Sequence, residues 1–113
     1  MGTNIRLQYL ENIDALTKST QDQKIKWFQQ NQSTYYCNIS SSTALIQKII
    51  DFENAIKFFF ELRDVGANSS FLKLDSTLGV DYNKKLADLY DTIEKFSDDK
   101  AINRFNDIIR TIQ

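Results

Sequence analysis

Residues 43–65 read TALIQKIIDFENAIKFFFELRDV and give the strongest indication of the fold in this chain. The chain contains no proline, and no glycine occurs between Thr3 and Val65, so few residues in its first half resist a helical backbone. Gly66 follows at a place where a left-handed residue commonly ends a helix. Apolar side chains recur at alternating spacings of four and three residues, which is typical of one helix face. These side chains are Leu45, Ile49, Phe52, Ile56 and Phe59. We therefore predict that residues 43–65 form the longest, central helix.

Helical periodicity continues on both sides of this stretch. The first predicted helix begins near residue 3 or 4, either of which can cap it, and a Ser-Thr pair can cap the second. Two further segments, residues 33–43 and 67–80, are interpreted as connections because they are rich in Ser, Thr and Asn. The remaining predicted helices cover about residues 3–18, 20–32, 81–96 and 97–113. The sequence thus predicts an all-α fold, a compact four- to five-helix bundle forming a single domain over residues 1–113.

Composition limits the functions that this domain can perform. The chain has 113 residues, of which 42% are hydrophobic and 26% charged, and a formal net charge of −1. It contains no histidine, the side chain most often used for acid–base chemistry near neutral pH and for binding transition metals. The near-zero charge gives no overall attraction to nucleic acid or an anionic membrane. We expect no enzyme activity, no cofactor and no small-molecule substrate.

The cellular location is inferred from the cysteine content and the first residues. Cys37 is the chain's single cysteine, so it forms no internal disulfide. Residues 1–14 contain no hydrophobic block of the kind found in secretory signal peptides. Both features favour a reducing compartment, and we expect a cytoplasmic protein without a membrane-spanning segment.

The predicted central helix carries apolar side chains on nearly all sides. With Ile56 facing the core, Phe58, Leu62 and Val65 fall on the opposite side of the helix. One interpretation is a helix enclosed by the others; the second is an exposed patch that binds a partner or a second copy. Trp27 also lies off the main apolar stripe of its helix. Phe58, Leu62, Val65 and Trp27 are therefore the candidate partner-binding residues.

Catalytic and metal-binding constellations are weak in this sequence. Cys37 has no histidine to activate it and is interpreted as a small buried residue. The pairs Glu61–Asp64 and Asp88–Asp91 have helical spacing and could offer oxygen ligands to Mg²⁺. Because they point away from the predicted core stripes, we interpret them as solvated acids, and we expect no catalytic or metal site.

Two functional hypotheses follow from these observations. The first is a non-enzymatic protein-interaction module of the regulator, adaptor, immunity or inhibitor type, which binds a protein partner or forms a homodimer through an apolar helix face. The alternative is a nucleic-acid-associated protein that uses a helix carrying Lys24, Lys26 and Trp27, since lysines beside an aromatic ring can hold a nucleic-acid strand.

Overall fold

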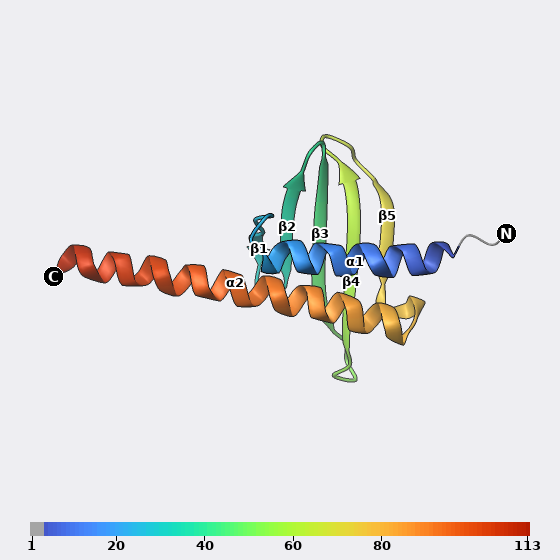
Figure 1. The fold of residues 1–113 in the computed structure, drawn as a ribbon. Helices are drawn as coiled ribbons and strands as arrows, with labels where there is room; N and C mark the ends of the chain where they lie inside the picture. Colours follow the sequence, from blue (N-terminus) through green and yellow to red (C-terminus); the bar gives the residue numbers. More distant parts are fainter. Residues whose placement is uncertain (1–3) are drawn as a thin grey trace.

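The computed structural model describes residues 4–113, except for the side chains of residues 98–101 and 103. Over these residues the fold is α+β, with a five-stranded antiparallel sheet (Figure 1). The prediction of an all-α, four- to five-helix bundle is therefore wrong. In chain order the elements are α1 (Ile5–Gln21), β1 (Phe28–Asn31), β2 (Thr34–Ile39), β3 (Ser42–Ile50), β4 (Ile56–Asp64), β5 (Ser70–Asp75), the short 3-10 helix η1 (Ser76–Leu78) and α2 (Val80–Ile112).

The predicted central helix over residues 43–65 is instead the hairpin of β3 and β4. Ala44 and Ile46 on β3, and Phe58 and Phe60 on β4, are buried at a spacing of two, while the residues between them point to the other face. The apolar residues of 43–65 fit the repeat of a helix as well as that of a strand. Their β-branched and aromatic side chains, however, fit a pleated surface better than a helix.

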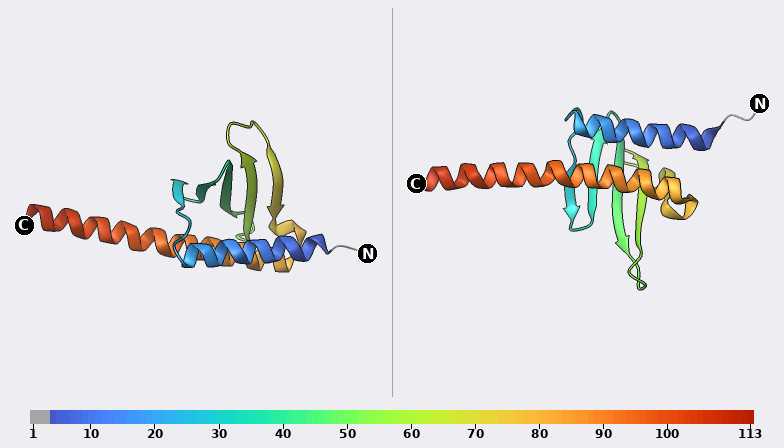
Figure 2. Two further views of the ribbon diagram at one scale, coloured as in Figure 1. Left: turned by 45° about the horizontal axis from the view of Figure 1, so that its top comes forward. Right: turned by 60° about the horizontal axis from the view of Figure 1, so that its bottom comes forward.

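The strands follow one another in space in the order β1-β2-β3-β4-β5, each antiparallel to the next. One row of paired residues crosses four of them and supplies much of the inner face: Tyr35, Ile46, Phe60 and Leu74. All four are buried beneath the helices. The opposite, outer face of the sheet is not covered by either α-helix (Figure 2).

The two helices lie side by side on the inner face and run in the same direction (Figures 1 and 2). The prediction of an N-terminal helix is confirmed, and the Asn4 side chain caps α1 by accepting a hydrogen bond of 3.0 Å from the Leu7 backbone N–H. Arg6 connects the starts of both helices, because its guanidinium pairs with Asp81 and lies 4.7 Å from the centre of the Tyr82 ring.

Helix α2 replaces the two helices predicted over residues 81–113 and extends beyond the rest of the molecule. Its 33 residues span about 50 Å, whereas the 17 residues of α1 span about 25 Å. The radius of gyration is 16.0 Å, larger than the roughly 13 Å of a compact domain of similar length. Between residues 4 and 113, neither α-helix contains a segment with the length and apolar character that a bilayer crossing requires.

Candidate protein-binding surface

The four residues predicted to bind a partner do not form one surface. Phe58 is 4% exposed and its ring packs 5.5 Å from that of Tyr90. Trp27 is 8% exposed, and its indole N–H donates a 2.9 Å hydrogen bond to Thr20. Both side chains are therefore largely enclosed in the core of the fold.

The other two residues lie on opposite sides of the sheet. Leu62 is half-buried and lines an apolar hollow of about 410 Å³ between α1 and the sheet. Val65 is exposed and follows β4, at the rim of a hollow on the outer face. Of the three side chains predicted on the far side of the central helix, Phe58 is therefore enclosed by the rest of the fold. Leu62 is half-buried, and only Val65 is openly accessible.

The predicted acidic pairs and lysines are also separated. Glu61 lies on the outer face of β4, whereas Asp88 and Asp91 lie on α2. Among the described residues, no three side chains of His, Cys, Asp or Glu come together as a metal site would require. Lys24 and Lys26 precede β1 in an irregular segment instead of occupying a helix, and the buried Trp27 offers no ring for a base to stack on.

Cys37 is completely buried in the inner face of β2, as the sequence predicted. Burial raises the pKa of its thiol from 9.0 to about 12, against the smaller opposing effect of a hydrogen bond with the Ala44 backbone. The neutral thiol form is therefore strongly favoured, which disfavours a nucleophilic role.

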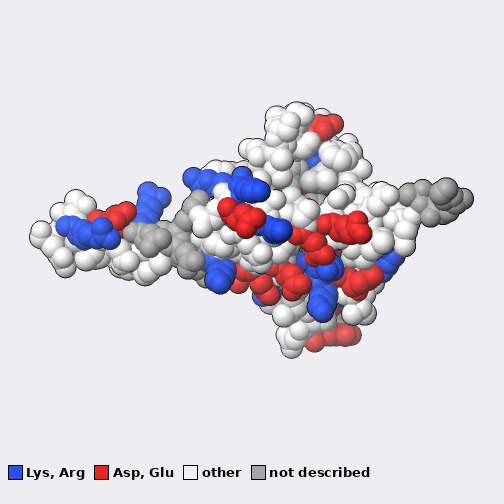
Figure 3. All heavy atoms as spheres, viewed as in Figure 1, with Lys and Arg blue, Asp and Glu red and all other residues white. Residues whose placement is uncertain are grey.

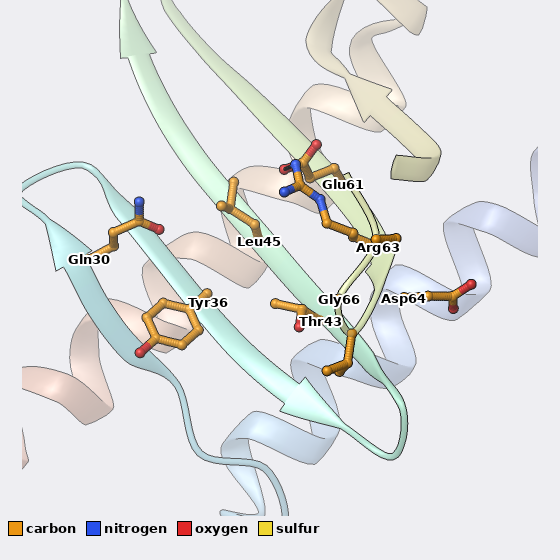
Figure 4. Close-up of a pocket in the computed structure, with 10 residues that line it drawn as sticks. Gln30, Tyr36, Thr43, Leu45, Glu61, Arg63, Asp64 and Gly66 are labelled. Carbon is orange, nitrogen blue, oxygen red and sulfur yellow. Dashed lines mark hydrogen bonds and ion pairs between the residues drawn. The ribbon is translucent and has the colours of Figure 1, made fainter. Parts of the chain in front are cut away.

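The outer face of the sheet contains a hollow of about 660 Å³ (Figure 4). Tyr36 and Gln30 lie on one side of it, and Glu61 and Arg63 lie on the other. Arg63 donates a 3.1 Å hydrogen bond to Glu61, which also accepts one from Ser70. The charges of Glu61 and Arg63 therefore neutralise each other, and the hollow offers a mixed surface without a dominant ligand chemistry.

The distal segment of α2, residues 102–112, presents a different surface. Its five large apolar side chains are exposed for between 37% and 74% of their area. Among the side chains of α2 that the structure describes, in contrast, the buried ones lie between Tyr82 and Ile93. The exposed side chains are Ile102, Phe105, Ile108, Ile109 and Ile112. Soluble proteins rarely expose so many neighbouring apolar side chains unless something binds there.

This apolar face does not continue the stripe that packs against the sheet. At 100° per residue, the side chains of Ile102, Phe105 and Ile109 are rotated by nearly half a turn, roughly 160°, from those of Leu86, Leu89 and Ile93. Helical periodicity in the sequence identifies both stripes but predicts two separate helices for them. The rotation between the two stripes on one continuous helix was the signal that could have revealed the distal face.

Between this segment and the sheet lies a hollow of about 660 Å³, here named the β1–α2 notch. Strand β1 is one edge of the sheet, and all four of its residues are exposed. Lys26 lies over the Phe28 ring, with its ammonium 5.4 Å from the ring centre. The notch is lined by Lys26, Trp27, Phe28, Gln29, Ser97, Arg104, Phe105 and Ile108. Trp27, Phe28, Phe105 and Ile108 thus give it apolar walls, and among the described side chains that line it the charged ones, Lys26 and Arg104, are basic.

Comparison with known proteins does not assign a family. No protein-family model, no curated protein and no solved structure matches this chain.

Proposed function

We propose that this protein is a non-enzymatic protein-interaction module, of the regulator, adaptor, immunity or inhibitor type, which binds protein through the distal segment of α2. The observation that carries the proposal is the exposure of five apolar side chains on this part of the helix. Helix-in-groove recognition uses such faces, with anchors spaced by three and four residues. Ile102, Phe105 and Ile109 have this spacing.

The composition of the distal segment supports the need for a partner. Its eleven residues include four Ile, two Asn, one Thr and one Asp, which are weaker helix formers than Ala or Leu. Short helices gain most of their stability from packing of an apolar face, and isolated ones below about 12–15 residues are marginal in water. A partner that covers this face would supply the missing packing.

The size of the apolar face indicates that it does not act alone. Its five side chains expose roughly 500 Å² between them, so with a matching area on a partner the contact would bury roughly 1,000 Å². A standard stable interface buries roughly 1,600 Å² in total. The helix face by itself would therefore support only weak binding, and we include the adjoining β1–α2 notch in the binding surface. We also propose a cytoplasmic location, which the unpaired, buried Cys37 supports.

The test is site-specific photo-crosslinking in the cells that make the protein. A photoreactive residue at Ile108 should give a crosslinked peptide, identified by mass spectrometry, from another protein or from a second copy. Ile109→Asp should abolish that product, because a charge would enter the buried centre of the interface. The matched control is Val80→Asp on the same helix, where the side chain is 87% exposed far from the notch, and it should leave the product unchanged. A crosslinking pattern that Ile109→Asp does not alter would contradict the proposal.

A further inference from the structure

A second exposed apolar feature lies at the turn between β3 and β4. This β3–β4 turn, residues 50–56, reads IDFENAI and projects beyond the helices at the bottom of Figure 1. Phe52 at its tip is 94% exposed, and Ile50 and Ile56 are 62% and 48% exposed. Two acids, Asp51 and Glu53, accompany them, and Figure 3 shows uncharged surface beside acidic atoms at this end of the molecule.

The turn is held in one conformation by its own hydrogen bonds. The Asp51 carboxylate accepts backbone hydrogen bonds of 2.8 Å from Glu53 and 3.0 Å from Ala55, and Lys57 pairs with it at 3.4 Å. The Ala55 hydrogen bond is the largest of the effects that hold the pKa of Asp51 below its ordinary value. Phe52 is thus presented on a preorganised support, which lowers the entropy cost of binding.

We propose that the β1–α2 notch binds the β3–β4 turn of a second copy of this chain, and that two such contacts, related by a two-fold axis, form a closed dimer. The inference rests on the proposed function and names the occupant of that surface. Phe52 of one copy would pack against Phe28, Phe105 and Ile108 of the other.

Charge complementarity favours this occupant. The basic side chains at the notch are Lys26 and Arg104, and no acidic residue is among the described residues that line it. The turn supplies the opposite sign through Glu53, beside an aromatic anchor of the type enriched at binding hot spots. Opposite charges flanking matched apolar surfaces fix the register of an interface.

The two surfaces cannot meet within one molecule. The notch lies beside β1 at one edge of the sheet, while the turn extends away from the helices at the end of β3 and β4 (Figures 1 and 2). Both are attached to the same packed sheet, so neither can reach the other without unfolding it. A second copy supplies each surface with its complement.

The buried area favours a closed pair over an open chain. An aromatic side chain buries roughly 150–250 Å², so Phe52 with Ile50 and Ile56 would bury roughly 400 Å². With a matching area on the notch, one contact reaches roughly 800 Å², and two reciprocal contacts reach roughly 1,600 Å², the size of a standard stable interface. Two-fold closure is also the commonest symmetry of soluble homo-oligomers.

The first test is the molar mass of the full chain by light scattering. The wild-type protein should give the mass of two chains, and Phe52→Ser should give the mass of one, with self-association weakened at least tenfold. The matched control is Phe71→Ser, which removes another exposed aromatic ring from β5 and should leave the dimer intact. Circular dichroism should show all three proteins equally folded. A single-chain wild type, a dimeric Phe52→Ser, or larger open assemblies would each overturn the proposal.

The second test exchanges charges across the interface. Glu53→Lys alone, and Lys26→Glu with Arg104→Glu alone, should each be monomeric, because like charges then meet at both contacts. Their equimolar mixture should dimerise again, because every turn now faces a notch of opposite charge. A mixture that stays monomeric, or single variants that still dimerise, would contradict the pairing of these surfaces.

The outcomes separate this inference from the function on which it rests. If the wild type is monomeric but the Ile108 photo-crosslink captures a different protein in an Ile109-dependent manner, the second copy is excluded and the interaction module stands. If the wild type is monomeric and no Ile109-dependent crosslink forms, both fail.

Discussion

Among single residues, one buried polar pair, Thr20 and Trp27, connects the end of α1 to the start of β1. Thr20 and Trp27 are 3% and 8% exposed. The Thr20 hydroxyl accepts the indole N–H and itself donates a 2.8 Å hydrogen bond to the Leu16 carbonyl. All the hydrogen-bonding capacity of the indole is therefore used inside the core. This contact fixes the segment between α1 and β1, and with it one wall of the notch.

We expect Thr20→Val to destabilise the protein by about 1–3 kcal/mol, because the shape is kept while a buried indole N–H loses its acceptor. Thr20→Ser retains the hydroxyl and should cost less. Unfolding in urea, followed by tryptophan fluorescence, measures both changes. Equal stability of the wild type and Thr20→Val would show that water satisfies Trp27.

Cys37 gives a prediction about pH. Because burial raises the pKa of its thiol to about 12 from 9.0, the folded state holds the proton more tightly than the unfolded chain. Its contribution to the free energy of unfolding is therefore complete below pH 9 and decreases as the pH rises from 9 towards 12. The Tyr90 hydroxyl, whose pKa burial also raises to about 12, acts in the same direction above pH 10.

In the native protein at pH 8, a thiol-specific disulfide reagent should react with Cys37 only as fast as the protein unfolds. Once the chain is denatured in urea, the reaction should be stoichiometric. Cys37→Ala should reduce the fall of stability between pH 9 and 10. Rapid labelling of the native thiol would contradict its burial.

At the scale of elements, the helices could be predicted from the sequence and the sheet could not. The apolar stripes of α1 and of the first half of α2 match the period of a helix and not that of a strand. Leu86, Leu89 and Ile93 of α2 are buried as expected. Residues 43–65 match both helix and strand periods, so the decision depended on turn signals. Ser40 and Asn54 adopt positive φ angles of 58° and 64° and form the turns on either side of β3 without glycine or proline.

The binding surface was predictable only in part, for a related reason. Apolar periodicity identified the side chains of the distal segment, but it cannot say whether a helix face meets its own core or solvent. Whether the distal face of α2 meets the core or solvent depends on where the sheet ends. Phe58 and Trp27 lie off the predicted helical stripes, but Phe58 belongs to β4 and Trp27 directly precedes β1, so a helical stripe does not describe either position.

The two halves of α2 should respond differently to the same type of truncation. Leu86→Ala removes a side chain with no exposed area and should cost about 2–5 kcal/mol through lost burial and a cavity. Ile109→Ala in the monomer should change stability by no more than about 0.5 kcal/mol, since alanine is also the better helix former. Urea unfolding at a dilution where the chain is monomeric compares them. A loss at Ile109 as large as that at Leu86 would place the distal segment in the monomer's own core.

At the scale of the whole molecule, the shape separates a folded body from a projecting helix. The principal extents are 65 × 37 × 28 Å, so the long dimension is nearly twice the next. The body consists of the sheet, α1 and the first half of α2, and it contains the buried apolar residues. The distal segment and the β3–β4 turn lie outside it and carry exposed apolar side chains. Stability thus resides in the body, and binding is assigned to the projections.

Amide hydrogen exchange along α2 tests this division most directly, at a dilution where light scattering gives the mass of one chain. Residues 82–93 should exchange only through global unfolding, while residues 102–112 should exchange orders of magnitude faster through local fraying. Uniform, strong protection along the whole helix of the monomer would contradict the account, because the distal face would then already be covered within a single molecule.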